Sequence, residues 1–113
     1  MLILYDYKDC VNLSFEITDF IPDVLGIQDT NHNIIKYNKA GYNFLNITPE
    51  EAIGKKCYEL IGRNKPCENC ATSKVYESKK PEKVIKYFED MDIWLDVRSY
   101  PIFDNHGNLR YVI

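Results

Sequence analysis

The sequence lacks the features that mark several large classes of protein. Its 113 residues include only five glycines, five prolines and one tryptophan, and no glycine-, serine- or proline-rich stretch interrupts them. A chain of this length without a linker or a repeat is expected to form one domain. Its longest aliphatic run, Met1–Leu4, is far shorter than the ~20 residues that cross a bilayer. We therefore expect a soluble, cytoplasmic domain with no membrane insertion of its own, although a parent protein can carry an anchor elsewhere.

An excess of charge of one sign is also missing. Lysine and arginine number 14 against 17 acidic residues, which gives a formal net charge of −3, and the basic residues are scattered along the chain. Nucleic-acid-binding proteins instead gather basic residues into a patch or stripe. The sequence has no glycine-rich phosphate loop, no G-x-S-x-G and no H-E-x-x-H motif. We expect neither nucleic-acid binding nor catalysis from this chain.

The cysteines are the most uneven feature that is present. The chain has four of them, and nothing in it indicates secretion, so the thiols are expected to be reduced. Cys57, Cys67 and Cys70 form a C-x9-C-x2-C cluster, whereas Cys10 stands alone. The cluster is the candidate functional site, and Cys10 is expected to be inert.

The first half of the chain predicts a hairpin followed by short helices. Strands are expected at 24–28 and 34–37, joined by an Asn- and Asp-rich turn at 29–33, after a short helix at 12–21. Further short helices are expected at 39–45, after Thr48, at 57–61 and at 69–78. Their start and stop signals are Asn38 as one N-cap, Thr48 and Glu51 as a capping box with Pro49 at the first helical position, and Gly54 as a stop.

The last third predicts β-structure. Strands are expected at 82–88, 93–103 and 109–113, separated by polar turns. Alternation in the long strand places Ile93, Leu95 and Val97 on a buried face, with Trp94, Asp96, Arg98 and Tyr100 opposite. A block of helices between two antiparallel hairpins indicates an α+β fold.

In this order the elements resemble the PAS sensor-domain family over residues 12–113, with 1–11 as an N-terminal extension. The segments that carry the resemblance are Ile27-Gln28-Asp29, Ile34 to Ala40, Thr48 to Lys55, Trp94 to Val97, Tyr100 to Asp104, and Gly107 before Leu109. One departure is Asn33, where the family usually has glycine.

The resemblance implies a five-stranded antiparallel sheet in the order 2-1-5-4-3, with helices on one face enclosing a small pocket. It also implies a sensory module of a signal-transduction protein, such as a two-component sensor histidine kinase. Such a module relays its signal to an output domain that this chain does not contain, and commonly forms a homodimer. A ligand-free dimerisation or interaction module, using the sheet face that bears Trp94 and Tyr100, is the alternative. A free-standing redox or metal-handling enzyme is a weaker one.

Three interpretations of Cys57, Cys67 and Cys70 remain open. Thiolates at this spacing can bind zinc or an iron–sulfur cluster, with Cys10, His32, His106, a carboxylate or water as a further ligand. Alternatively, Cys67 and Cys70 lie at the start of the helix predicted at 69–78, where the helix dipole favours thiolate, so a reversible disulfide from Cys67 to Cys70 or Cys57 can form. In the third interpretation the cysteines are small apolar residues without a ligand.

The residues argue against haem and flavin. Haem needs an axial ligand in the pocket helices, whereas His32 and His106 lie in predicted hairpin turns, where solvated side chains are expected. Cys57 stands where the light-oxygen-voltage branch of the family carries its photoreactive cysteine. However, Lys56 and Tyr58 depart from that branch's Asn-Cys-Arg-Phe-Leu-Gln motif, and Leu95 replaces the expected flavin-binding asparagine.

Aromatic residues and one cation complete the candidate site. An apolar ligand pocket with polar groups at its rim is the usual setting for a small ligand. Arg98 could grip an anionic ligand, although an ion pair with Asp96 is the simpler expectation. The possible pocket-lining residues are Tyr37, Phe44, Tyr58, Tyr87, Trp94, Tyr100 and Arg98.

Overall fold

The computed structural model describes residues 17–113, which form an α+β fold as predicted. Of the helix predicted at 12–21, only its end is described: Ile17 and Thr18 are helical and a turn follows. Cys10 and the predicted boundary at residue 12 lie outside the described residues. The elements are β1 (Gly26–Gln28), β2 (Ile34–Tyr37), α2 (Lys39–Leu45), α3 (Pro49–Ala52), the 3-10 helix η1 (Glu59–Ile61), α4 (Ala71–Ser78), β3 (Glu82–Phe88), β4 (Ile93–Ser99), β5 (Pro101–Phe103) and β6 (Leu109–Val112).

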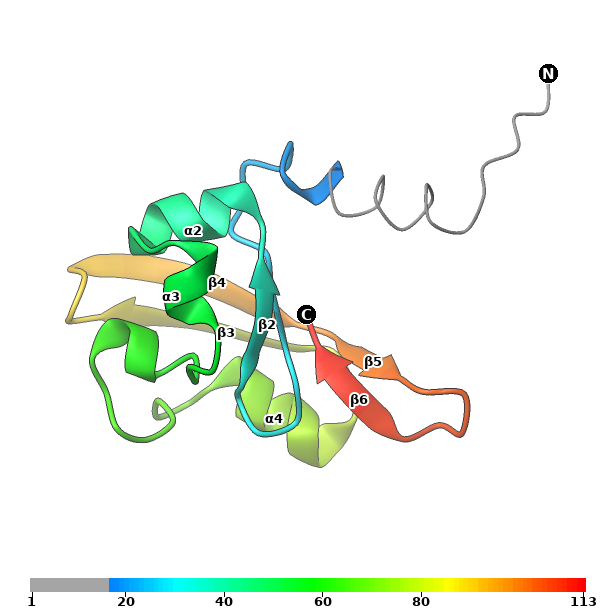
Figure 1. The fold of residues 1–113 in the computed structure, drawn as a ribbon. Helices are drawn as coiled ribbons and strands as arrows, with labels where there is room; N and C mark the ends of the chain where they lie inside the picture. The colour runs from blue at the N-terminus through cyan, green and yellow to red at the C-terminus, as the bar shows by residue number, and fades with distance from the viewer. Residues whose placement is uncertain (1–16) are drawn as a thin grey trace, which may run out of the picture.

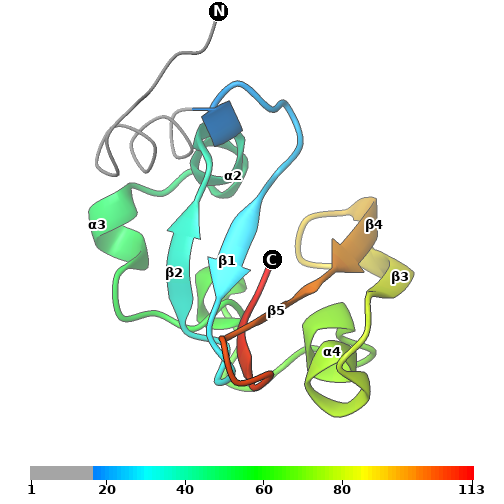
Figure 2. The same cartoon turned by 90° about the vertical axis from the view of Figure 1, so that its right-hand side faces the viewer.

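The strands pair antiparallel in the predicted order. One sheet runs β2-β1-β6-β5, and β3 pairs with β4 along its full length. The strand predicted at 93–103 is divided into β4 and β5 by Tyr100, whose N–H and C=O both pair with Ile113. With β4 and β5 counted as one strand, the order is 2-1-5-4-3. Figure 2 shows β1 and β2 on one side of the molecule, β3 and β4 on the other, and α4 beneath the second pair.

The helices begin where local sequence signals predict. Asn38 caps α2 by accepting a hydrogen bond from the N–H of Gly41, and Thr48 caps α3 by accepting one from Glu51. Helix α4 begins at Ala71, two residues later than predicted, with Cys70 at the N-cap. These short helices lie between β2 and β3 in the chain and pack around the sheet (Figure 1).

The core lies between the sheet and the helices. Val75 of α4 and Val112 of β6 are fully buried, and Val84 and Phe88 face inward from β3. A second cluster joins Ile34 and Tyr37 of β2 to Ala52 of α3. Side chains on β3 and β4 alternate between buried and exposed, so each strand has one inner face. Within the described part of the chain, no helix has the length and apolar character that crossing a membrane requires.

Candidate functional site

The three clustered cysteines line one pocket of about 160 Å³. Cys57 precedes η1, and Cys67 and Cys70 lie on the loop that leads into α4. The opposite wall is apolar and comes from the inner faces of β3 and β4. The other lining residues are Gln28, Tyr58, Ile61, Asn69, Ala71, Thr72, Val84, Lys86, Phe88 and Val97. The fold therefore brings together three thiols that the sequence spreads over two separate loops.

Burial keeps Cys57 in its thiol form. Loss of solvation, and then the nearby Cys70 and Cys67, raise the pKa of Cys57 to about 12. Its backbone N–H donates to the carbonyl of His32 at 3.0 Å, which fixes the residue against the β1–β2 turn. At neutral pH, Cys57 is thus a neutral hydrogen-bond donor.

The other two cysteines have polar surroundings. The Sγ of Cys70 accepts a hydrogen bond from the N–H of Ser73 at 3.4 Å, so a thiol caps α4. The guanidinium of Arg63 lies beside Cys67. Hydrogen bonding to Asp90, and then the neighbouring Cys67, raise the pKa of Arg63. Cys67 therefore has a cation next to it.

The expectation that His32 is a solvated turn residue is wrong. Its exposed fraction is 7%, because the β1–β2 turn folds onto α4. Its Nδ1 lies 3.6 Å from the Sγ of Cys57, and its Nε2 lies 3.3 Å from the Oγ of Ser73. The ring also contacts Tyr76 edge to face, with 5.0 Å between centroids. Burial lowers the pKa of His32, and Lys56 lowers it further, which favours a neutral ring. By contrast, His106 is exposed in its turn.

Gln28 is a second residue that sequence reasoning missed. It comes from β1 and lines the cysteine pocket. Its Oε1 is buried and has no hydrogen-bond partner in the described part of the chain. A buried acceptor without a partner is unfavourable by about 1–3 kcal/mol. A donor from a bound molecule would remove that penalty. No sequence motif marked this residue, because its position opposite Cys57 depends on the packing of β1.

The described part of the chain, residues 17–113, does not contain a ready-made metal centre. Three thiols and an imidazole form a donor set that zinc accepts. However, among residues 17–113 no three side chains of His, Cys, Asp or Glu lie close enough together to hold a metal ion. The thiols of Cys57, Cys67 and Cys70 are free and surround a cavity, not a single point. Metal binding would therefore require the loop that carries Cys67 and Cys70 to move.

The remaining candidate residues lie in several places. Tyr58 lines the cysteine pocket. Tyr37 is buried against Tyr42 elsewhere in the core, and Phe44 is partly exposed on α2. The other four lie on the outer side of the β3–β4 hairpin: Tyr87, Trp94, Arg98 and Tyr100.

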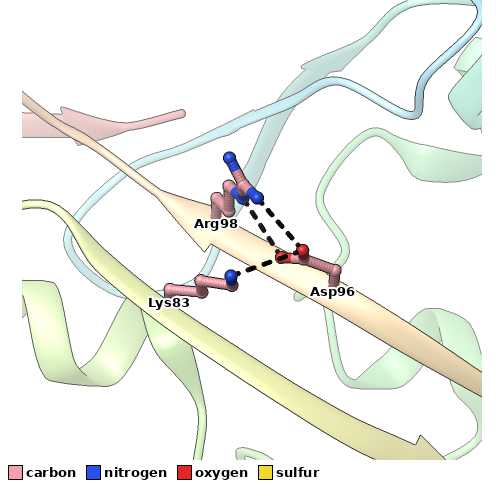
Figure 3. Close-up of polar contacts among 3 residues, drawn as sticks. All are labelled: Lys83, Asp96 and Arg98. Atoms are coloured by element: carbon pink, nitrogen blue, oxygen red, sulfur yellow. Dashed lines mark hydrogen bonds and ion pairs between the residues drawn. The ribbon is translucent and has the colours of Figure 1, made fainter.

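Arg98 has a partner on its own strand. Its Nε and Nη2 each donate to Asp96 at 3.2 Å, and Lys83 of β3 lies 3.8 Å from the same carboxylate (Figure 3). All three side chains are exposed, so this ion pair adds little stability. In this arrangement Arg98 points away from the cysteine pocket, and its guanidinium is already paired with the carboxylate of Asp96.

Comparisons with known proteins agree with the fold. A family model described as a PAS domain matches residues 22–113. The PAS domain of Bordetella pertussis BvgS is 15% identical with a TM-score of 0.64, over 92% of this chain and 82% of that one. A sensory box sensor histidine kinase from Vibrio cholerae is 17% identical with a TM-score of 0.68, over 93% and 86%. The light-state dimer of the fungal blue-light photoreceptor Vivid is 14% identical with a TM-score of 0.60, over 99% and 95%. At these identities the likeness shows the fold alone, and no curated protein matches the chain.

Proposed function

The chain belongs to the PAS domain family, and from this we propose that it serves a signal-transduction protein as a sensory domain whose signal is received at the cysteine pocket. A PAS domain is a sensory module and is not itself catalytic. The parent protein we propose is a two-component sensor histidine kinase. The similar Vibrio cholerae structure is of a sensor histidine kinase, which supports this choice.

The observation that carries the proposal is the convergence of three thiols on one small pocket. Cysteines that serve only as apolar core residues have no reason to face a common cavity. Here Cys57, Cys67 and Cys70 all do, and Gln28, whose Oε1 has no hydrogen-bond partner among the described residues, lines the same pocket. The site therefore combines three thiols with a side chain that can still accept a hydrogen bond.

Oxidation of the thiols fits this arrangement better than a resident metal. Cys67 has the Arg63 cation beside it, and Cys70 lies three residues further along the same loop. An oxidant such as hydrogen peroxide would join Cys67 to Cys70 or Cys57, with two thiols and one peroxide giving one disulfide and two waters. Zinc or an iron–sulfur cluster at the same cysteines is the competing outcome.

Flavin and haem are not part of the proposal. Vivid is a blue-light photoreceptor with this fold, so the fold itself is compatible with photoreception. The argument against flavin comes from this chain's residues, since Leu95 stands where the flavin-binding asparagine is expected. His32 is buried, but its two ring nitrogens already face Cys57 and Ser73, which leaves neither free as a haem ligand.

A count of free thiols tests the proposed signal. Protein purified without oxygen is analysed for zinc and iron and then treated with equimolar hydrogen peroxide. We expect wild type to lose two of its four thiols without forming dimers. Cys67→Ser should lose no thiols to an internal disulfide. The matched control Cys10→Ser should behave as wild type. Stoichiometric metal that Cys67→Ser abolishes would overturn oxidation as the signal. Unreactive thiols with no bound metal would overturn the role of the pocket.

A second candidate function is supported by the outer side of the β3–β4 hairpin. Trp94 has an exposed fraction of 71% and Ile85 of 59%, and the partly exposed Tyr87 packs beside Trp94 with 5.6 Å between ring centroids. Exposed aromatic clusters of this kind are typical of protein–protein interfaces. We propose that this face mediates homodimerisation or contact with the output domain.

A further inference from the structure

His32 connects the cysteine pocket to helix α4. On one side its Nδ1 faces the Sγ of Cys57 at 3.6 Å, and on the other its Nε2 faces the Oγ of Ser73 at 3.3 Å. Cys57 lies on the loop before η1 and Ser73 lies in α4, and the imidazole of His32 contacts both side chains. The backbone N–H of His32 also donates to the hydroxyl of Tyr76, which lies one turn further along α4. A single buried side chain therefore links the thiol to the helix at two points.

Counting donors limits this contact chain to two directions. A neutral imidazole has one N–H donor and one acceptor nitrogen, and a neutral thiol has one S–H to donate. Burial keeps both Cys57 and His32 neutral at pH 7. Two arrangements satisfy both partners, and in the one that we assign to the reduced protein the S–H of Cys57 donates to Nδ1 and the Nε2–H of His32 donates to the hydroxyl oxygen of Ser73.

We propose that His32 is a positioning residue that relays the chemical state of Cys57 to Ser73 and so to the start of α4. When Cys57 loses its S–H, its sulfur can only accept. The proton of the imidazole then moves from Nε2 to Nδ1, so that Nδ1–H donates to sulfur and Nε2 accepts from the hydroxyl of Ser73. The ring gains and loses no net proton, and the hydrogen bond to α4 reverses. This inference rests on the proposed function only in that thiol oxidation supplies the change at Cys57.

The position of Ser73 explains why such a reversal would matter. Ser73 lies in the first turn of α4, and its backbone N–H is bound by the Sγ of Cys70. The preceding residue, Thr72, contacts Ser99 of β4 through their buried hydroxyls at 3.2 Å. The first turn of α4 is thus held by Cys70, His32 and Ser99 at once. A change in one of these bonds acts on a helix start that packs directly against the sheet.

Nitrogen NMR of the imidazole tests the proposal directly. The chain has only two histidines, so His106→Gln identifies the signals of His32. In reduced wild-type protein at pH 7 we expect Nε2 to carry the proton and Nδ1 to be bare. In Cys57→Met, which keeps a sulfur acceptor without an S–H, we expect the proton on Nδ1. Cys67→Met is the matched control, because Cys67 lines the same pocket without contacting His32, and the wild-type tautomer should persist there.

The outcomes separate clearly. A protonated Nδ1 or a doubly protonated ring in wild type would overturn the relay without any substitution, so the proposal stays testable even if Cys57→Met does not fold. An unchanged tautomer in Cys57→Met would overturn it as well.

A thermodynamic cycle adds a readout that a merely structural histidine would not produce. Urea unfolding is measured for Cys57→Ala, Ser73→Ala and the pair. Because the two sites communicate through His32, we expect the effects on the unfolding equilibrium constant to depart from additivity by about twofold or more. In a His32→Phe background they should become additive. Additive effects with His32 present would contradict the relay.

Failure of the His32 relay and failure of the proposed function can be distinguished. The imidazole spectrum is recorded on reduced protein and depends on hydrogen bonding alone. The peroxide titration depends on thiol reactivity alone.

Discussion

The thiol of Cys57 makes folding sensitive to alkaline pH. Burial raises its pKa from the usual 9.0 to about 12, so the folded protein holds a proton that the unfolded chain releases above pH 9. The stabilisation is complete below pH 9 and is lost as the pH rises through 12. Between pH 8 and pH 10 we expect the free energy of unfolding to fall by about 1.4 kcal/mol from this group. The half-buried Tyr76, with its pKa raised to about 12, adds a loss of the same sign.

Urea denaturation at several pH values between 8 and 10 measures this decline. Cys57→Ala should flatten it, because the titrating group is removed. Cys70→Ser is the control that leaves Cys57 in place and should keep the wild-type slope. Equal slopes in wild type and Cys57→Ala would show that burial of this thiol does not set the pH dependence.

Asn38 is the most heavily bonded single side chain at a helix start. Its Oδ1 accepts from the N–H groups of Gly41 and Leu25, and it is almost fully buried. Its Nδ2 donates to three carbonyls in the preceding segment, those of Thr18, Ile21 and Asp23. Helix α2 is therefore tied at its first residue to the chain that leads into β1.

Comparing two caps tests this assignment. Asn38→Ala leaves several buried groups unpaired, and we expect a loss of about 3 kcal/mol or more in unfolding free energy. Thr48→Ala removes one exposed cap bond and should cost about 1 kcal/mol. Asn38→Asp keeps the acceptor and loses the donors, so it should fall between them. Comparable losses for Asn38→Ala and Thr48→Ala would refute the role assigned to the buried amide.

Local signals made much of the fold predictable. Asn38 and Thr48 cap helices through bonds to residues three positions away, so the sequence alone contains the whole interaction. The hairpin turn at 29–33 is similar, since Asp29 accepts hydrogen bonds from the N–H groups of Asn31 and Asn33. The order of hairpin, short helices and hairpins followed from such signals and was confirmed.

Features that depend on packing between distant segments were not predictable in the same way. The division of the long strand at Tyr100 lies where the strand changes partner, from β3 up to Ser99 to β6 from Pro101, and no local pattern contains these pairings. His32 is buried because its turn packs against Ser73 and Tyr76, which lie more than 40 positions further along the chain. The cysteine spacing predicted a cluster of Cys57, Cys67 and Cys70, and the three residues line one pocket, but spacing cannot distinguish thiols around a cavity from thiols around an ion.

The fold as a unit places the cysteine pocket and the outer face of the hairpin on opposite sides of β4. Val97 faces the pocket, and its neighbours Asp96 and Arg98 face outward. Ser99, at the end of β4, contacts α4 through Thr72, and the same strand carries the exposed Trp94. A change at α4 therefore has a short structural route to the surface proposed for association.

Sedimentation tests whether that surface associates. If the outer face forms a homodimer, Trp94→Ala should weaken the dimer at least tenfold, because a buried tryptophan at an interface contributes about 2 kcal/mol or more. Ile53→Ala is the matched control, since Ile53 is as exposed as Trp94 but follows α3. A wild-type monomer at high concentration, or equal weakening by Ile53→Ala, would contradict the proposed interface.

The backbone of His32 has a consequence of its own. Its φ of 64° lies in the left-handed region, where a residue with a side chain costs about 1–2 kcal/mol. The contacts of the ring with Cys57, Ser73 and Tyr76 offset that cost. The left-handed backbone of the β1–β2 turn is thus stabilised by contacts of the His32 side chain with residues outside the turn. Loss of one of those contacts would leave the cost of the left-handed backbone without its offset, so a change at a single sulfur would also lower the stability of the turn.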